Sequence, residues 1–139
     1  MIYEFCAENV TLLEKAMQAG ARRIELCDNL AVGGTTPSYG VTKAAVELAS
    51  NYDTTIMTMI RPRGGDFVYN DLEISIMLED IRLTAQAGSQ GVVFGALTAD
   101  KKLDKANLEK LIAASKGMEI VFHMAFDDLS DQDQLEAID

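Results

Sequence analysis

The sequence is poor in basic residues. Twelve lysines and arginines stand against 22 aspartates and glutamates in 139 residues, which gives a formal net charge of −10. Nucleic acids and anionic membrane surfaces are bound through clustered lysine and arginine side chains, so this balance argues against both as partners. No apolar run approaches the roughly 20 residues that a membrane-spanning helix needs. We therefore expect neither nucleic acid nor membrane as a partner.

Cysteine is also scarce, since Cys6 and Cys27 are the only two in the sequence. Two cysteines cannot build the disulfide framework of a small secreted protein. The N-terminal stretch MIYEFCAEN has no basic residue ahead of its apolar ones, as a secretory signal peptide would have. These features predict a reducing, cytoplasmic location.

Short apolar runs alternate with amphipathic stretches along the chain. The predicted strands are Ile2–Cys6, Arg23–Cys27, Thr54–Ile60, Gly91–Gly95 and Met118–Phe122. The predicted helices are Asn9–Ala19, Val41–Ser50, Asp71–Ala87, Asp104–Ala114 and Asp131–Asp139. Strands that alternate with helices indicate βα units on a parallel sheet, hence an α/β fold. A chain of this length, 48% hydrophobic, has material for one core, and we expect a single domain over residues 1–139.

The helix over Asp71–Ala87 has the clearest boundaries. Asn70 is suited to cap its first turn, Glu73 three residues later completes a capping box, and Gly88 ends it. Ser38 and Asp104 are the corresponding capping residues of two other helices.

Two architectures fit this alternation. Five strands in about 140 residues is the size of a flavodoxin-like open sheet, whereas a TIM (β/α)8 barrel needs eight strands and at least ~200 residues. The strands of an open doubly wound sheet are buried on both faces and are expected to be continuously apolar. Glu4, Arg23 and Glu25 lie inside predicted strands, and this favours a barrel with a polar interior.

Alternation along the strands assigns these charges to one shared face. Glu4 and Cys6 fall on the same face of the first strand, and the same pattern groups Arg23, Glu25 and Cys27 on the second and Met57, Met59 and Arg61 on the third. Buried charges persist only when they are paired. Several charges on successive strands therefore predict one common polar interior, open at the carboxyl ends of the strands.

The two cysteines have two interpretations. Cys6 and Cys27 end the first two predicted strands, and neighbouring strands lie ~4.8 Å apart. At that separation two thiolates could share one soft ion such as Cu(I), with Met57 or Met59 as a further sulfur ligand. Free cysteine is also among the residue types that are most often buried, and the residues alone favour simple packing.

A second group of polar residues is a candidate for substrate binding or catalysis. Its members are Glu4, Arg23, Glu25, Arg61, Arg63, Asp66, His123 and Asp127. Active sites of TIM barrels lie at the carboxyl ends of the strands. There, Arg61 and Arg63 with the amides of Gly64 and Gly65 could hold an anion, and His123 could act as acid, base or ligand.

This group predicts an enzyme for a small anionic or phosphorylated metabolite, with Glu25, Arg61 and His123 as catalytic residues. Glu4, Arg63, Asp66 and Asp127 would then help to bind the substrate. In the structural alternative, Arg61 and Arg63 only neutralise Glu4, Glu25 and Asp66, because buried carboxylates need such partners.

Five stretches of the sequence resemble the copper homeostasis protein CutC family. They are RIELCDNLAVGGTTPSYG (23–40), MIRPRGGDFVYND (59–71), MLEDIRL (77–83), GVVFGALTADKKLD (91–104) and FHMAFD (122–127). The resemblance runs from Ile2 to Asp127. It implies a TIM-barrel fold, Cu(I) bound at Cys6 and Cys27, and a homo-oligomer.

The sequence departs from this family in two ways. It covers five βα units, so we expect an incomplete barrel with open edges. The family motif His-Arg-Ala-Phe-Asp also reads His-Met-Ala-Phe-Asp here, with Met124 in place of the arginine. Any role of that arginine toward an anion or a carboxylate is therefore not transferred to this chain.

Overall fold

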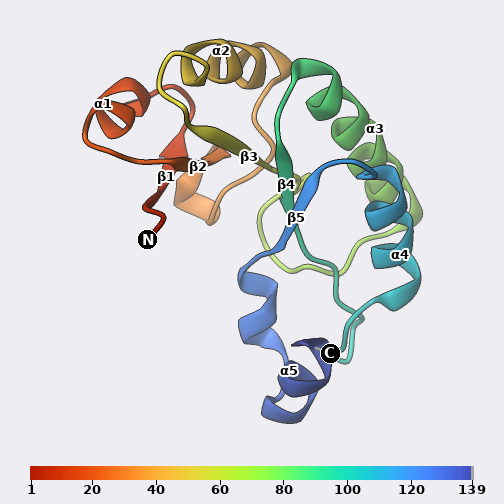
Figure 1. The fold of residues 1–139 in the computed structure, drawn as a ribbon. Helices are drawn as coiled ribbons and strands as arrows, with labels where there is room; N and C mark the ends of the chain where they lie inside the picture. Colours follow the sequence, from red (N-terminus) through yellow and green to blue (C-terminus); the bar gives the residue numbers. More distant parts are fainter. Residues whose placement is uncertain (139) are drawn as a thin grey trace.

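Five βα units follow one another in the computed structural model, which describes residues 1–138 (Figure 1). The strands are β1 (Glu4–Glu8), β2 (Arg23–Cys27), β3 (Thr55–Met59), β4 (Gly91–Phe94) and β5 (Glu119–Phe122). The α-helices are α1 (Leu13–Gln18), α2 (Tyr39–Ala49), α3 (Asp71–Ala87), α4 (Lys105–Ala114) and α5 (Asp131–Ile138). Two short 3₁₀ helices, η1 (Leu30–Val32) and η2 (Met124–Asp128), follow β2 and β5.

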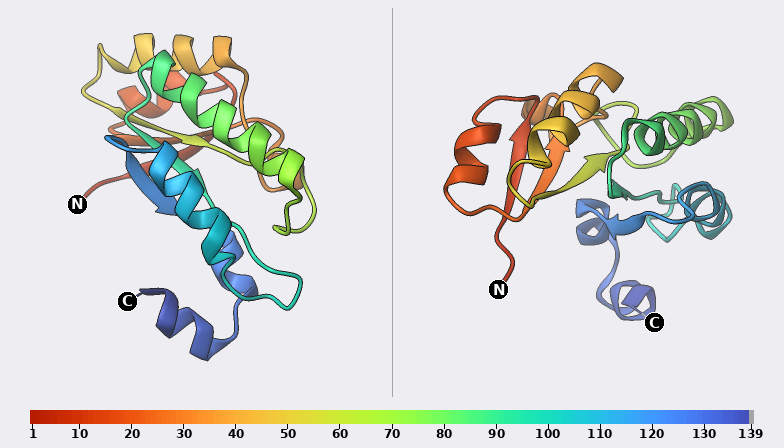
Figure 2. Two further views of the ribbon diagram at one scale, coloured as in Figure 1. Left: turned by 90° about the vertical axis from the view of Figure 1, so that its right-hand side faces the viewer. Right: turned by 45° about the horizontal axis from the view of Figure 1, so that its top comes forward.

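The order of the strands decides between the two predicted architectures. All neighbouring strands are parallel, and they lie in the order β1-β2-β3-β4-β5. A flavodoxin-like sheet has the order 2-1-3-4-5 and helices on both faces. Here helices α1 to α4 follow one another along the same side of the curved sheet (Figure 2). The fold is that of the TIM-barrel family, represented by five βα units, and the open-sheet alternative is wrong.

The helix boundaries follow the predicted capping residues. Asn70 and Glu73 form a reciprocal capping box at the start of α3, and Gly88 ends that helix with a positive φ of 91°. The side chain of Ser38 accepts a hydrogen bond at the start of α2, and Asp104 does the same for α4. Local sequence therefore determines where the three longer helices begin.

The first βα unit differs from the prediction. Strand β1 runs to Glu8, so Cys6 lies in the middle of the strand and not at its carboxyl end. Helix α1 begins only at Leu13, because Asn9 and Leu12 have positive φ angles of 56° and 57° and cannot belong to a right-handed helix. The chain therefore turns twice between β1 and α1, where the sequence predicted one continuous helix.

The main apolar core lies between the sheet and its helices. Met17 of α1 and Met77 of α3 are both buried there. Met17 belongs to a cluster that packs the strands against α1 and α2, and Met77 belongs to a cluster that packs them against α3 and α4. Burial of a large apolar side chain contributes roughly 1.5–3 kcal/mol, so this layer holds the strands in place. No helix in residues 1–138 is long and apolar enough to cross a membrane.

The opposite face of the sheet is mixed. A small buried cluster lies at its centre and consists of Cys27, Met57, Met59 and Val93. Nearer the amino ends of the strands, Arg23 lies 3.7 Å from the Glu4 carboxylate and 3.5 Å from that of Glu119. The charges inside the strands thus share one face, as their alternation predicted, and Glu4 is paired with Arg23, whereas Glu25 forms no ion pair within residues 1–138.

Candidate functional site

The two thiols lie side by side on neighbouring strands. Cys6 of β1 is aligned with Glu25 of β2, and Glu8 is aligned with Cys27, so the cysteines are diagonal neighbours on one face. Their sulfur atoms are 4.0 Å apart. The Glu25 Oε1 atom is 3.8 Å from the Cys6 Sγ and 3.7 Å from the Cys27 Sγ. Cys6, Glu25 and Cys27 form a group whose ligand atoms all lie within 4.8 Å of one another.

The environment raises the pKa of all three groups. Burial, followed by the charges of Cys6 and Glu25, raises the pKa of the Cys27 thiol well above its usual range. The pKa of Cys6 is raised by burial and then by the Glu25 carboxylate, and that of Glu25 by burial and then by Glu4. A metal ion that binds thiolates at this place displaces protons.

A glycine and a methionine pack against the buried sulfur. Gly34 has a φ of +92°, and a Cβ atom there would lie 3.1 Å from the Cys27 Sγ and 3.6 Å from the terminal methyl of Met59. The backbone of the loop after η1 therefore lies so close to the Cys27 sulfur that a side chain in place of Gly34 would press on it. The same contacts place the Met59 side chain beside Cys27.

Arg61 is held by backbone carbonyl groups. It follows β3 and is only 3% exposed. Its Nη1 atom donates to the carbonyls of Val32 at 2.7 Å and Gly34 at 3.0 Å, and its Nη2 atom donates to that of Gly65 at 2.8 Å. No carboxylate in residues 1–138 forms an ion pair with it. The structural alternative, in which it neutralises strand carboxylates, is wrong for Arg61.

Arg63 is paired with carboxylates. Its guanidinium bonds Glu73 in the first turn of α3 and lies 3.1 Å from the Asp66 carboxylate. The hydrogen bond from Arg63 lowers the pKa of Glu73 more than any other interaction does. Arg63 thus neutralises Asp66, as the structural alternative predicted, and it also ties the loop after β3 to α3.

The two glycines after Arg63 bring this loop against η1. A Cβ atom at Gly64 would lie 2.9 Å from the Cβ of Val32. Gly65 has a positive φ of 83°, and its carbonyl accepts the bond from Arg61. The glycines therefore allow the close loop contact that Arg61 bridges.

His123 is a neutral, buried imidazole. It follows β5, is 7% exposed, and its Nδ1 atom accepts a 3.2 Å hydrogen bond from the Ala125 amide, which leaves its proton on Nε2. Burial, and then the charge of Arg61, lower the pKa of His123 to about 4. Gly95 makes room for the ring, since a Cβ atom there would lie 2.7 Å from its Cε1.

The predicted site residues thus form two clusters. Cys6, Glu25 and Cys27 form the first, which we call the thiol pair and its glutamate. Arg61 and His123 belong to the second, which we call the Arg61 cluster. The Cζ atom of Arg61 lies 4.9 Å from the centre of the Phe67 ring, and the centre of the His123 ring lies 5.0 Å from the same point. No hydrogen bond or ion pair within residues 1–138 joins Glu25 to Arg61 or His123.

The remaining candidates lie outside both clusters. Glu4 pairs with Arg23, and Asp127 is exposed in η2. The side chain of Met124 lies close to Gly33, in the loop that Arg61 bonds. Sequence reasoning missed Phe67 and Tyr69 as members of the second cluster, although both belong to the stretch IRPRGGDFVYND that stood out in the sequence.

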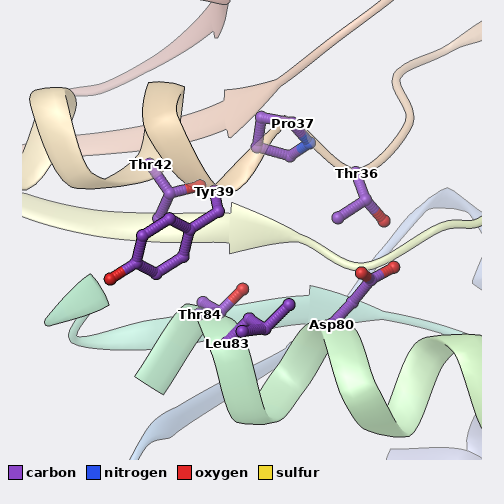
Figure 3. Close-up of a pocket in the computed structure, with 7 residues that line it drawn as sticks. All are labelled: Thr36, Pro37, Tyr39, Thr42, Asp80, Leu83 and Thr84. Carbon is purple, nitrogen blue, oxygen red and sulfur yellow. The ribbon is translucent and has the colours of Figure 1, made fainter. Parts of the chain in front are cut away.

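A small polar pocket between α2 and α3 is not a candidate ligand site. Tyr39 and Thr42 of α2 and Asp80 and Thr84 of α3 line it (Figure 3), and its volume is about 20 Å³. That is room for one water molecule. Burial raises the pKa of Asp80 at this place, and we assign the pocket to helix packing.

The fold and the first cluster define a TIM-barrel-type protein with a pair of neighbouring thiols on the inner face of its sheet. The model of the CutC family matches residues 1–139, and the chain belongs to this family. A CutC family protein of Streptococcus pyogenes serotype M6 is 54% identical over 139 residues, and one of Enterococcus faecalis is 53% identical over the same length. In both cases the match covers 100% of this chain and 66% of the relative, so this chain spans just under two thirds of their length.

Solved structures agree with this assignment. The crystal structure of a candidate copper homeostasis protein CutC from Streptococcus agalactiae matches with a TM-score of 0.95 at 49% identity, over 99% of this chain and 66% of that one. A candidate phosphonomutase from Burkholderia cenocepacia matches with a TM-score of 0.65 at 16% identity, over 99% of this chain and 70% of that one. The second likeness concerns the fold alone.

Proposed function

We propose that this chain takes part in copper homeostasis by binding Cu(I) as cargo between Cys6 and Cys27. The observation that supports this most is the 4.0 Å separation of the two sulfur atoms on neighbouring strands. Membership of the CutC family and the name of the Streptococcus agalactiae relative point in the same direction. Free thiols persist in reducing compartments, so the proposal includes a cytoplasmic location.

The spacing of the sulfurs fits a bridging metal ion. A metal–thiolate bond of about 2.3 Å, as for zinc, lets two sulfur ligands lie up to about 4.6 Å apart. The observed 4.0 Å requires only a bent arrangement or a small movement of the Cys6 side chain. Loss of the thiol protons to solvent or to Glu25 accompanies binding.

The donor set favours Cu(I) over harder ions. Thiolate and thioether ligands select Cu(I), whereas Mg²⁺ and Ca²⁺ prefer oxygen ligands. Two thiols with one carboxylate provide mainly sulfur, and Met59, packed beside Cys27, offers a third sulfur. Structural zinc sites use four ligands, one more than this group of three provides.

The unequal exposure of the two thiols suits a cargo ion. Cys27 is fully buried, and Cys6 is exposed. An exposed thiol is open to a donor or acceptor of copper, and a buried one keeps the ion in place during exchange. We therefore assign entry and exit of the ion to the Cys6 side.

An anaerobic Cu(I) titration against a competing chelator tests this function. The wild type is compared with the double variant Cys6→Ser/Cys27→Ser, and with Met77→Leu as a control that alters a methionine of the helix-side core. Loss of a supporting residue of a metal site weakens affinity ~10–100-fold, and loss of both thiols should cost more. Met77→Leu should bind as the wild type does. Equal affinity in the double variant and the wild type would refute the proposal.

A further inference from the structure

Three buried polar atoms near the carboxyl ends of the strands have no partner. They are the Nε of Arg61, the hydroxyl of Tyr69 and the Nε2 of His123, and no protein group in residues 1–138 forms a hydrogen bond with any of them. The three residues are 3%, 7% and 7% exposed. Buried polar atoms without a partner are rare in native structures, because each has lost its hydrogen bonds to water.

All three atoms can donate a hydrogen bond. The Nε of arginine always carries a proton, and the Nε2 of His123 carries one because Nδ1 accepts from the Ala125 amide. The tyrosine hydroxyl can donate as well. The atoms of Arg61 and His123 can only donate, so the partner that they lack is an acceptor, and the tyrosine hydroxyl can donate to the same acceptor.

The charge of Arg61 indicates that this acceptor is an anion. The guanidinium bonds three neutral carbonyl groups, those of Val32, Gly34 and Gly65, and forms no ion pair in the described chain. A buried charge without a counter-charge is costly. His123 is neutral near pH 7, since its pKa is about 4, so it does not add a second charge.

Arg61 lies near each of the other two donor residues. The Arg61 guanidinium lies 4.9 Å from the centre of the Phe67 ring, and the ring of His123 lies 5.0 Å from it. The charge of Arg61 acts on the pKa values of both His123 and Tyr69. A pocket of about 350 Å³ adjoins this group through Phe67, whereas its lining includes none of the three donor residues.

We propose that Arg61, Tyr69 and His123 form a binding site for a small oxyanion, in which an oxygen of a carboxylate or phosphate group accepts hydrogen bonds from the three side chains. The site follows β3 and β5 and is separate from the thiol pair. It binds its anion whether or not the thiols bind copper.

Isothermal titration of the full chain with sodium phosphate, sulfate and acetate, at constant chloride concentration, tests the site. Comparison of the three anions separates tetrahedral from planar oxyanions. Wild type should bind at least one of them saturably. Tyr69→Phe, which removes a single donor, should bind about tenfold more weakly. Tyr39→Phe, at an exposed tyrosine, should bind as the wild type does.

Two further measurements distinguish binding from a structural effect. Without added oxyanion, Tyr69→Phe should melt at the same temperature as the wild type or higher, because its unpaired hydroxyl is gone. Cys6→Ser/Cys27→Ser should keep the full anion affinity even if it loses copper. The proposal is overturned if no anion binds wild type saturably, or if Tyr69→Phe binds as tightly as wild type.

Discussion

The thiol pair and the Arg61 cluster lie on the same molecule but are built in opposite ways. Cys6 is exposed, and the contacts of the two thiols with each other and with Glu25 are all 3.7–4.0 Å long. Arg61 is buried and makes three bonds of 2.7–3.0 Å to backbone carbonyls of two loops. The thiols can rearrange around an ion at little cost, whereas Arg61 cannot move without releasing the loops. The first region is therefore suited to the proposed exchange of a cargo ion, whereas the second holds the loops together.

Two consecutive glycines connect the regions. Gly33 and Gly34 have φ angles of +89° and +92°. A Cβ atom at Gly33 would lie 3.2 Å from the Nη1 of Arg61, whereas one at Gly34 would lie 3.1 Å from the Cys27 sulfur. Adjacent positions with the same backbone conformation thus face different clusters.

The largest expected effect is on stability, at Arg61. Arg61→Gln removes the three bonds that join the loops after β2 and β3 and leaves the buried carbonyl of Gly34 without this donor. We expect a loss of about 3 kcal/mol or more in the free energy of unfolding, measured by urea denaturation. Arg63→Gln, whose partners are more exposed, should cost clearly less. Equal losses in the two variants would contradict the distinction made for Arg61.

The second effect is a pH dependence at His123. Its pKa is about 4 in the folded state, against about 6.5 in an unfolded chain. The unfolded state therefore binds more protons between these values, and stability is complete above pH 6.5 and falls as the pH drops to 4. The loss attributable to His123 should be about 3 kcal/mol.

The matched variant for this prediction is His123→Gln, which cannot titrate. The raised pKa of Glu25 has the opposite effect on stability, because the stability contributed by its protonated form is lost as the pH rises. The difference between wild type and His123→Gln in urea denaturation at pH 4.5 and pH 7.5 isolates the histidine. An unchanged difference across this range would show that His123 is not kept neutral by the fold.

The glycine pair offers a third test. Gly33→Ala and Gly34→Ala impose similar strain, roughly 1–2 kcal/mol, because both positions have a left-handed backbone. Only Gly34→Ala presses on the Cys27 sulfur. We expect Gly34→Ala to weaken Cu(I) binding and Gly33→Ala to leave it unchanged, as measured by chelator competition. The reverse order would mean that the sulfur cluster is not the copper site.

The smallest expected effect concerns the thiols in the absence of metal. Cys27→Ser places a hydroxyl in a fully buried position and should lower the free energy of unfolding by about 1–2 kcal/mol. Cys6→Ser, at an exposed position, should change it by less than about 0.5 kcal/mol. Thermal melts of both variants check this order, and a larger loss for Cys6→Ser would contradict the burial pattern.

Much of the fold follows from local signals. The capping box of Asn70 and Glu73 and the stop at Gly88 are properties of adjacent residues, so the sequence predicts them. Charges inside the strands predicted a shared polar face, and Glu4, Arg23 and Glu25 do share it. The start of α1 was not predictable, because nothing in the residue types of Asn9 and Leu12 required both to adopt positive φ.

The candidate site was only partly predictable. Alternation along neighbouring strands brings Cys6 and Cys27 together. Two of the three carbonyl partners of Arg61 lie 27 and 29 residues away in the sequence, and no local pattern indicates which backbone oxygens a side chain reaches. For the same reason, the sequence predicted Arg61 at a rim shared with the carboxylates, whereas Arg61 donates to Val32 of η1 and forms no ion pair within residues 1–138.

X-ray absorption at the copper edge, on the anaerobically loaded chain, tests the central claim most directly. Binding between Cys6 and Cys27 predicts a first shell of two or three sulfur ligands that disappears in Cys6→Ser/Cys27→Ser. A first shell made only of nitrogen and oxygen atoms, or a sulfur shell that persists in the double variant, would contradict it.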